Sequence, residues 1–302
     1  MTAGSVSIRA AVYMVLASLF WAGNYVLGAV AVSSMSPFDL TFLRWALAVV
    51  PLLVVAQLVE KPNWRAVLRA WPLLLLLALL GMLAYNLFLY QALNFTTPAS
   101  ASLVNAANPA TMALLAVLLV GQKLSPRAVV GIALSLVGVV VIISHGSLDA
   151  LLNLDINTGQ LLMVAAIIVW SLYSIWGRLI KTVPPITATA AQAVIVLIVM
   201  SPFALINGVA FPTEVEPLSA LLYIAIFPSV GSYILWNLAL RTTPPAIAGI
   251  YLNLITVFTV LIGVSLGQQV TLAEIIGGLI VIGGVLLTSV PSRTPRLAAH
   301  GK

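Results

Sequence analysis

The sequence predicts an all-α integral membrane protein with ten transmembrane helices, built as two inverted five-helix repeats. Three observations lead to this prediction: the composition, ten long apolar segments and an internal repeat. Hydrophobic residues make up 62% of the 302 residues and charged residues only 7%, whereas soluble domains carry about 25% charged residues. Because so few polar groups cannot cover a core in water, we expect the chain to lie in lipid.

Ten apolar segments are long enough to cross a bilayer core, which takes about 20 residues. They lie near residues 10–31, 37–58, 70–93, 98–119, 126–144, 159–179, 186–207, 217–239, 244–266 and 271–290. Prolines and polar runs separate them, and several prolines stand where a helix would begin, because the missing N–H costs nothing there. The first segment is too long for the apolar part of a signal peptide, so we expect no cleaved leader.

The charged residues predict the orientation of the chain. If the N-terminus is cytoplasmic, twelve of the thirteen basic residues fall in cytoplasmic segments and six of the seven acids in outer segments. Every loop then obeys the positive-inside rule. We therefore expect both termini in the cytoplasm of a bacterial cell, with the chain in its inner (plasma) membrane. Basic residues scattered singly through short loops also argue against a nucleic-acid partner.

The second half of the sequence repeats the first. Residues 90–144 align without gaps to residues 236–290, and both segments carry Thr-Thr-Pro and Gly-Gln in register. This predicts a first repeat over 9–144, a periplasmic linker over 145–157, a second repeat over 158–290 and a cytoplasmic tail over 291–302. Five spans is an odd number, so the second repeat enters the membrane from the opposite face. Inverted repeats that exchange conformations open a central site to each side in turn, which predicts a transporter; the alternative is a duplicated scaffold without cargo.

Small residues and prolines predict how some spans pack and bend. Two glycines seven residues apart share one helix face in the fifth span, and their repeat partners do so in the tenth, so we expect each helix to pack closely on a neighbour. These glycines are Gly131, Gly138, Gly277 and Gly284. Pro109 and Pro228 are expected to kink the fourth and eighth spans, either as gates or as ordinary packing bends.

Several short motifs carry a family resemblance. They are Trp21-Ala22-Gly23-Asn24, Pro37 with Arg44, Tyr90-Gln91-Ala92-Leu93, Thr97-Pro98-Ala99 and Gly121-Gln122-Lys123-Leu124. At these residues the chain resembles the drug/metabolite transporter superfamily, in the branch with two EamA-type repeats, and among its members the YddG-type exporters of aromatic amino acids. The resemblance implies an inner-membrane exporter with a central cavity. Gln122 and Gln268 depart from it, because many members have glutamate there, so no role of that acid is carried over.

Arg44 is the one charged residue well inside an apolar span. A buried arginine in a membrane is costly and is a functional candidate by default, and its planar guanidinium suits a carboxylate such as that of an amino acid. The alternative is that Arg44 reaches the outer headgroups or binds neighbouring carbonyls. Three tryptophans, Trp45, Trp71 and Trp176, are expected in the interfacial aromatic belts.

Aromatic and amide residues inside the spans complete the candidate site. The expected substrate-binding residues are Trp21, Asn24, Tyr25, Arg44, Tyr85, Asn86, Tyr90, Asn108, Trp170, Tyr173, Tyr233, Trp236, Asn237 and Tyr251. Amides find no partner in lipid, so these faces should turn inward. Aromatic faces with a few amides suit a flat, weakly polar substrate, and they also suit flat organic cations. The alternative is that the aromatics form interfacial belts and the amides join helices.

These observations predict a secondary exporter of amino acids, above all aromatic ones, and of related flat metabolites or drugs. Because no Asp or Glu lies in the middle of a span, we expect transport down a gradient rather than through a membrane carboxylate relay. The alternatives are an exporter of other metabolites, a lipid-linked carrier or flippase, and a membrane enzyme. Against the enzyme, we find no buried acid pair, no metal-ligand cluster and no Ser/His arrangement. We expect no catalytic residue, metal or cofactor; the partners are a small-molecule substrate and the bilayer, and the oligomeric state stays open, a monomer included.

Overall fold

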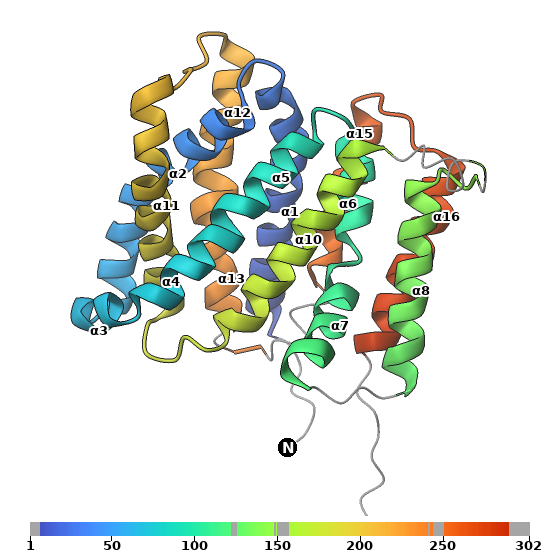
Figure 1. Cartoon of the computed structure of the whole chain (residues 1–302), viewed down its shortest axis with the longest axis horizontal. Helices are drawn as coiled ribbons and strands as arrows, with labels where there is room; N and C mark the ends of the chain where they lie inside the picture. Colours follow the sequence, from blue (N-terminus) through green and yellow to red (C-terminus); the bar gives the residue numbers. More distant parts are fainter. Residues whose placement is uncertain are drawn as a thin grey trace, which may run out of the picture.

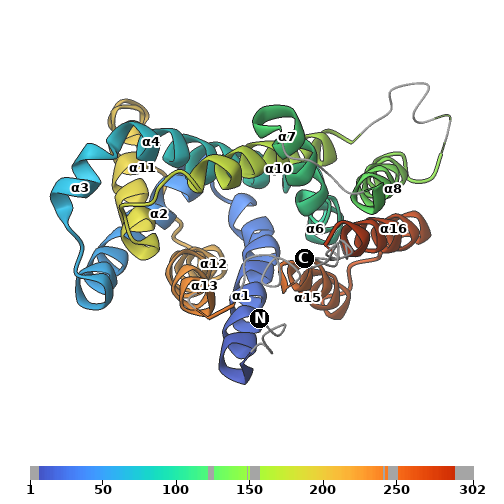
Figure 2. The ribbon, with the colours of Figure 1, turned by 90° about the horizontal axis from the view of Figure 1, so that it is seen from below.

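The computed structural model describes residues 7–121, 126–147, 149, 157–240, 242–243 and 251–289. Within these residues all regular structure is helical. A helix satisfies its backbone polar groups internally, which lipid requires of a spanning segment. The helices run side by side in a bundle (Figure 1), and seen from below they form an elongated section with α8 and α16 at one end and α2, α3 and α11 at the other (Figure 2).

The first half begins with two long helices and continues with shorter pieces. Its elements are α1 (Ile8–Val32), α2 (Pro37–Val55), the π-helical turn η1 (Ala56–Glu60), α3 (Trp64–Arg69), α4 (Trp71–Leu77), the π-helical η2 (Ala78–Ala84), α5 (Tyr85–Ala92), α6 (Pro98–Asn105), α7 (Asn108–Val120) and α8 (Pro126–Ile143). Ser7, Ser36 and Thr97 cap α1, α2 and α6 by accepting a backbone N–H of the first turn, so hydroxyls mark these helix starts as the capping preference predicts.

The second half follows the same order. Its elements are α10 (Thr158–Gly177), α11 (Pro185–Asn207), α12 (Val215–Ile226), the π-helical η3 (Phe227–Gly231), α13 (Ser232–Leu240), α15 (Asn253–Ser265) and α16 (Leu272–Ser289). Asn157 caps α10. Thr271 and Glu274 form a capping box at the start of α16: Thr271 N–H donates to Glu274 Oε2 at 2.8 Å, and Glu274 N–H donates to Thr271 Oγ1 at 3.2 Å.

Seven helical segments of the described chain are long and apolar enough to cross a membrane: Ile8–Val32, Pro37–Glu60, Trp71–Ala92, Pro98–Leu119, Thr158–Gly177, Pro185–Asn207 and Val215–Leu240. Three further apolar helices are shorter, at Val129–Ile143, Asn253–Ser265 and Leu272–Leu287. The beginning of the expected ninth span, residues 244–250, and most of the expected linker and tail lie outside the described residues. The chain is therefore a helical, multi-pass membrane protein, while the count of ten spans and the orientation of the termini stay predictions.

The third and fourth spans of each half are irregular at matching places. When the repeat alignment is extended without a gap, η2 (residues 78–84) aligns with residues 224–230, which overlap η3. The fourth span breaks at Ala106–Ala107 before α7, and its counterpart has a turn at Leu252 before α15. Pro228 lies within η3 and Pro109 in the first turn of α7. Both prolines therefore lie at irregularities of their spans, Pro228 in a π-helical turn and Pro109 just after a helix break.

Helices α8 and α16 pack against each other in antiparallel contact through the four predicted glycines (Figure 2). A Cβ on Gly138 would lie 2.6 Å from the carbonyl oxygen of Gly277, and one on Gly284 would lie 2.4 Å from that of Gly131. The close packing is confirmed, and the neighbour of each helix is its own repeat counterpart. In the repeat alignment Gly138 corresponds to Gly284 and Gly277 to Gly131, so the two glycine contacts are equivalent. A two-fold relation between the halves requires this equivalence.

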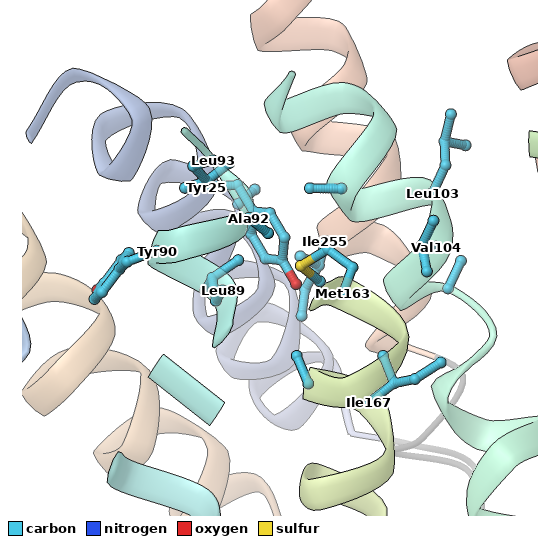
Figure 3. Close-up of a cluster of buried hydrophobic side chains, with 14 of the residues drawn as sticks. Tyr25, Leu89, Tyr90, Ala92, Leu93, Leu103, Val104, Met163, Ile167 and Ile255 are labelled. Carbon is cyan, nitrogen blue, oxygen red and sulfur yellow. The ribbon is translucent and has the colours of Figure 1, made fainter. Parts of the chain in front are cut away.

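A hydrophobic cluster joins the two halves where α5 ends and where α6 and α10 begin. It includes Leu89, Ala92, Leu93, Leu103, Val104, Met163, Ile167 and Ile255, all of which Figure 3 draws as sticks. Gly159 at the start of α10 allows a close approach, because a Cβ there would lie 2.6 Å from the carbonyl oxygen of Ala92. This packing joins the halves near the end of the bundle that the sequence predicts to face the periplasm.

Candidate functional site

A cavity of about 140 Å³ lies between the two halves. This is roughly ten times the space that one water molecule needs. Its lining comes from residues 21–112 of the first half and 170–255 of the second: Trp21, Asn24, Tyr25, Arg44, Gly81, Tyr85, Asn86, Asn105, Ala106, Asn108, Pro109, Met112, Trp170, Ser174, Tyr233, Leu252, Asn253 and Ile255. Among these described residues there is no aspartate or glutamate.

The irregular segments of both halves reach this cavity. Gly81 of η2 lines it, as do residues on both sides of the break between α6 and α7 and of the turn before α15. Asn108 is the first residue of α7, and Asn253 is the first residue of α15. Both helices therefore begin at the cavity, where the positive end of each helix dipole lies.

Nine of the fourteen residues expected at the site line the cavity. They are Trp21, Asn24, Tyr25, Arg44, Tyr85, Asn86, Asn108, Trp170 and Tyr233. They come from α1, α2, α5, α7, α10 and α13, so elements far apart in the sequence converge on one space.

Arg44 on α2 is buried, with 3% of its surface exposed. Its Nε and Nη2 donate to Ser229 Oγ at 3.0 and 2.7 Å, and its Nη1 donates to Asn86 Oδ1 at 2.5 Å and to Tyr90 Oη at 2.6 Å. The guanidinium also lies over the Trp45 ring, 4.8 Å from its centroid. Arg44 thus binds neutral side chains of other helices, instead of the headgroups or backbone carbonyls of the alternative interpretation.

The acceptors of Arg44 are themselves held in place. Ser229 Oγ donates to the carbonyl oxygen of Ile224 at 2.7 Å, and Asn86 Nδ2 donates to that of Met82 at 2.6 Å. Tyr90 Oη donates to Asn24 Oδ1 at 2.9 Å. Because each accepting side chain also donates a hydrogen bond to another group, its position is fixed, and the network fixes the guanidinium at the cavity wall.

Two aromatic groups stand in the cavity wall, one around Trp21 and one around its repeat counterpart Trp170. The Trp21 ring lies edge-on to those of Tyr233 and Trp236, at centroid distances of 5.8 and 5.6 Å. The Trp170 ring lies 4.8 Å from that of Tyr85 and 5.1 Å from that of Tyr173. These spacings are those of favourable aromatic pairs, so both halves present rigid aromatic surfaces.

Five expected site residues lie outside the lining. Tyr90 stands behind Arg44, from which its hydroxyl accepts a hydrogen bond. Tyr173 packs behind Trp170 against Gly81, and Trp236 packs behind Trp21. The remaining two, Tyr251 and Asn237, are half-buried; the Tyr251 ring packs on the cluster of Ala10, Met14 and Ala239.

Some lining residues were not expected at the site. Asn105 and Asn253 carry a sequence signal, an amide inside an apolar span, whereas Gly81, Met112, Leu252 and Ile255 carry none that separates them from ordinary core residues. One belt assignment is wrong: Trp45 is 1% exposed and its N–H donates to the carbonyl oxygen of Met82 at 3.3 Å. Trp71, by contrast, is 59% exposed. Gln122 lies outside the described residues.

The chain is similar to known transporters over nearly its whole length. A family model described as the EamA-like transporter family matches residues 8–144 and 157–290. An uncharacterized transporter of Archaeoglobus fulgidus is 31% identical over 280 residues, covering 91% of this chain and 96% of the relative. The aromatic amino acid exporter YddG of Ancylobacter novellus is 24% identical over 284 residues, covering 92% and 96%.

A solved structure shares the fold. One crystal structure of a protein superimposes with a TM-score of 0.67 at 22% sequence identity, covering 98% of this chain and 100% of the other. The resemblance noted from the sequence is confirmed by the family match, and the family and the named relatives are transporters rather than enzymes. The chain belongs to the EamA-like transporter family.

Proposed function

We propose that the chain is a secondary transporter that exports small, flat aromatic metabolites, aromatic amino acids among them, across the inner membrane. The observation that carries this proposal is the cavity between the halves, walled by Trp21 and Trp170 and by amides of both halves. Rigid aromatic faces with a few polar groups bind flat rings by stacking and fix them by hydrogen bonds. The name of the relative from Ancylobacter novellus agrees with this substrate class.

The mechanism that we propose is alternating access between two inverted repeats of five spans each, with both termini in the cytoplasm. Three features support a two-fold relation: the exchanged glycine contacts of α8 and α16, the matching π-helical turns, and the matching breaks beside the cavity. Both repeats can then exchange conformations around one site. Because no carboxylate is among the described lining residues, transport follows the substrate gradient.

Counterflow in proteoliposomes tests this function. Vesicles preloaded with unlabelled phenylalanine should accumulate labelled phenylalanine or tryptophan, and unlabelled indoles should compete. Trp170→Ala should lose most of this activity, because it removes one aromatic wall of the cavity. Trp71→Ala is the matched control, because this tryptophan is exposed and lies outside the lining. The proposal fails if no aromatic compound exchanges, or if both variants lose activity alike.

Accessibility mapping tests the inverted topology. The chain has no cysteine, so single cysteines can be introduced without first removing others. Cysteines replacing Ser34 and Asp149 should react with an impermeant thiol reagent from the periplasm, and those replacing Arg65 and Arg178 only from the cytoplasm. All four positions are exposed. Reaction of position 149 from the cytoplasm would make the repeats parallel and exclude the mechanism.

A further inference from the structure

We propose that the cavity recognises its substrate by a carboxylate, and that it prefers aromatic acids without an ammonium group to the corresponding amino acids and amines. This inference rests on the proposed function and names the substrate class of the same site. Three features carry it: the charge of Arg44, the direction of the amide hydrogen bonds and the two helix starts at the cavity.

The charge of Arg44 has no counterion in the described part of the chain. The four hydrogen bonds of Arg44 go to a serine, an asparagine and a tyrosine, all neutral. They use Nε, both hydrogens of Nη1 and one hydrogen of Nη2, which leaves one N–H of the guanidinium. A buried, unpaired charge in a membrane protein is costly. An anion in the cavity that Arg44 lines would supply the missing opposite charge.

The hydrogen-bond network occupies the oxygens of the lining amides Asn24, Asn86 and Asn108 and leaves donors on two of them. Tyr90 Oη accepts from Arg44, so its hydrogen goes to Asn24 Oδ1, and Asn24 Nδ2 is left as a donor. Asn108 Oδ1 accepts from Ser171 Oγ at 3.1 Å, which leaves Asn108 Nδ2 as a donor. Asn86 is satisfied at both atoms within the network. A carboxylate, which only accepts, matches these donors.

The starts of α7 and α15 add positive potential at the same place. Each helix has 13 residues, and the N-cap residues Ala107 and Leu252 have no side-chain oxygen to accept the N–H groups of the first turn. Such a helix start favours an anion. A substrate ammonium would face the same potential together with Arg44, and no described lining residue carries a negative charge to balance it.

One lining residue carries a buried acceptor without a partner. Asn105 Oδ1 is buried and has no hydrogen-bond partner, and its residue lines the cavity beside the break. Once the Asn105 side chain turns this oxygen into the cavity, a neutral ring N–H or a hydroxyl of the substrate can donate to it. Indole acids and phenolic acids carry both this donor and the carboxylate.

Binding to the purified full-length protein in detergent separates the possibilities, and it avoids the passive leak of weak acids through vesicles. Four ligands with one phenyl skeleton serve as probes in calorimetry at neutral pH: 3-phenylpropionate, phenylalanine, 2-phenylethylamine and the neutral 3-phenylpropanol. The acid should bind more tightly than phenylalanine and about tenfold or more tighter than the amine. Phenylalanine binding as tightly as the acid or more tightly, or the amine equalling the acid, would overturn the inference.

Variants locate the effect. Arg44→Gln should weaken binding of the acid about tenfold or more and leave the alcohol unchanged, so that the alcohol reports an intact aromatic site. Arg65→Gln is the matched control, because Arg65 is an exposed arginine outside the lining. If Arg44→Gln does not fold, Arg44→Lys keeps the charge and should retain the preference for the acid over the amine. If none of the four probes binds the unmodified protein, the proposed function fails; if the alcohol and the amine bind as well as the acid, only this inference fails.

Discussion

The α8–α16 contact makes a quantitative prediction about Gly284. In Gly284→Ala the new Cβ would lie 2.4 Å from the carbonyl oxygen of Gly131 and 2.5 Å from Ser135 Oγ, whereas ordinary contacts begin at 3.4 Å. The serine hydroxyl can rotate away, but the backbone carbonyl cannot, so the helices must part locally by about 1 Å. Overpacking of this kind costs about 1–3 kcal/mol. The variant should therefore be less stable.

The neighbouring Gly283 provides the matched control. A Cβ on Gly283 meets nothing within 4 Å, so Gly283→Ala adds only the better helix propensity of alanine, about 0.5–1 kcal/mol. That gain is common to both variants, and their difference isolates the packing cost of about 1–3 kcal/mol. Thermal unfolding in detergent, followed by tryptophan fluorescence, should place Gly284→Ala at least about 2 °C below Gly283→Ala. Equal melting temperatures would refute the close glycine contact.

Three further predictions concern the cap that Glu60 of the first repeat provides for α11 of the second, the cavity wall at Gly81, and the response of transport to a pH gradient. Glu60→Ala should destabilise the protein by about 1–2 kcal/mol, measured by thermal unfolding, because Glu60 accepts the N–H groups of Ile186 and Thr187 at 3.1 and 2.7 Å and so caps α11. Gly81→Val should weaken binding of aromatic ligands in calorimetry, because even a Cβ there would lie 2.4 Å from the Tyr173 ring, and that ring supports Trp170. Counterflow of phenylalanine should proceed equally well with and without a pH gradient, since no described lining residue is a carboxylic acid.

Each of these has an outcome that contradicts it. Glu216→Ala, at an exposed glutamate in the first turn of α12, should cost less stability than Glu60→Ala, and an equal loss in both glutamate variants would remove the capping argument. Gly177→Val should not affect binding, because a Cβ on Gly177 meets nothing within 4 Å; unchanged binding in Gly81→Val would show that the wall yields there. Strong uphill accumulation driven by protons alone would require a titrating group that the described lining lacks.

Features that depend on local composition were predictable from the sequence. Helix formation, the repeat and the intramembrane position of Arg44 follow from hydropathy, register and charge, because lipid enforces them segment by segment. Nine cavity residues were predictable for the same reason: an amide or aromatic residue in an apolar span has to face the protein interior.

Which individual side chains line the cavity depends on contacts between distant segments, and no local sequence pattern contains these contacts. Tyr90 and Asn86 lie four residues apart on α5, and both bind Arg44, yet only Asn86 lines the cavity, because Arg44 and Asn24 enclose Tyr90. The π-helical η2 also shifts the register between α4 and α5, so helical spacing from one side of it does not predict faces on the other.

The sequence by itself determined that this protein lies in lipid, that it contains a repeat and that it carries one costly charge inside the membrane. Each of these follows from residue type and spacing. Only the tertiary structure decided what surrounds that charge. Ser229, which accepts two hydrogen bonds from Arg44, lies 185 residues away in the chain. Which neutral groups enclose a buried cation, and whether a counterion is among them, depends on the packing of distant helices, and that packing is set by the fit of whole surfaces rather than by any single segment.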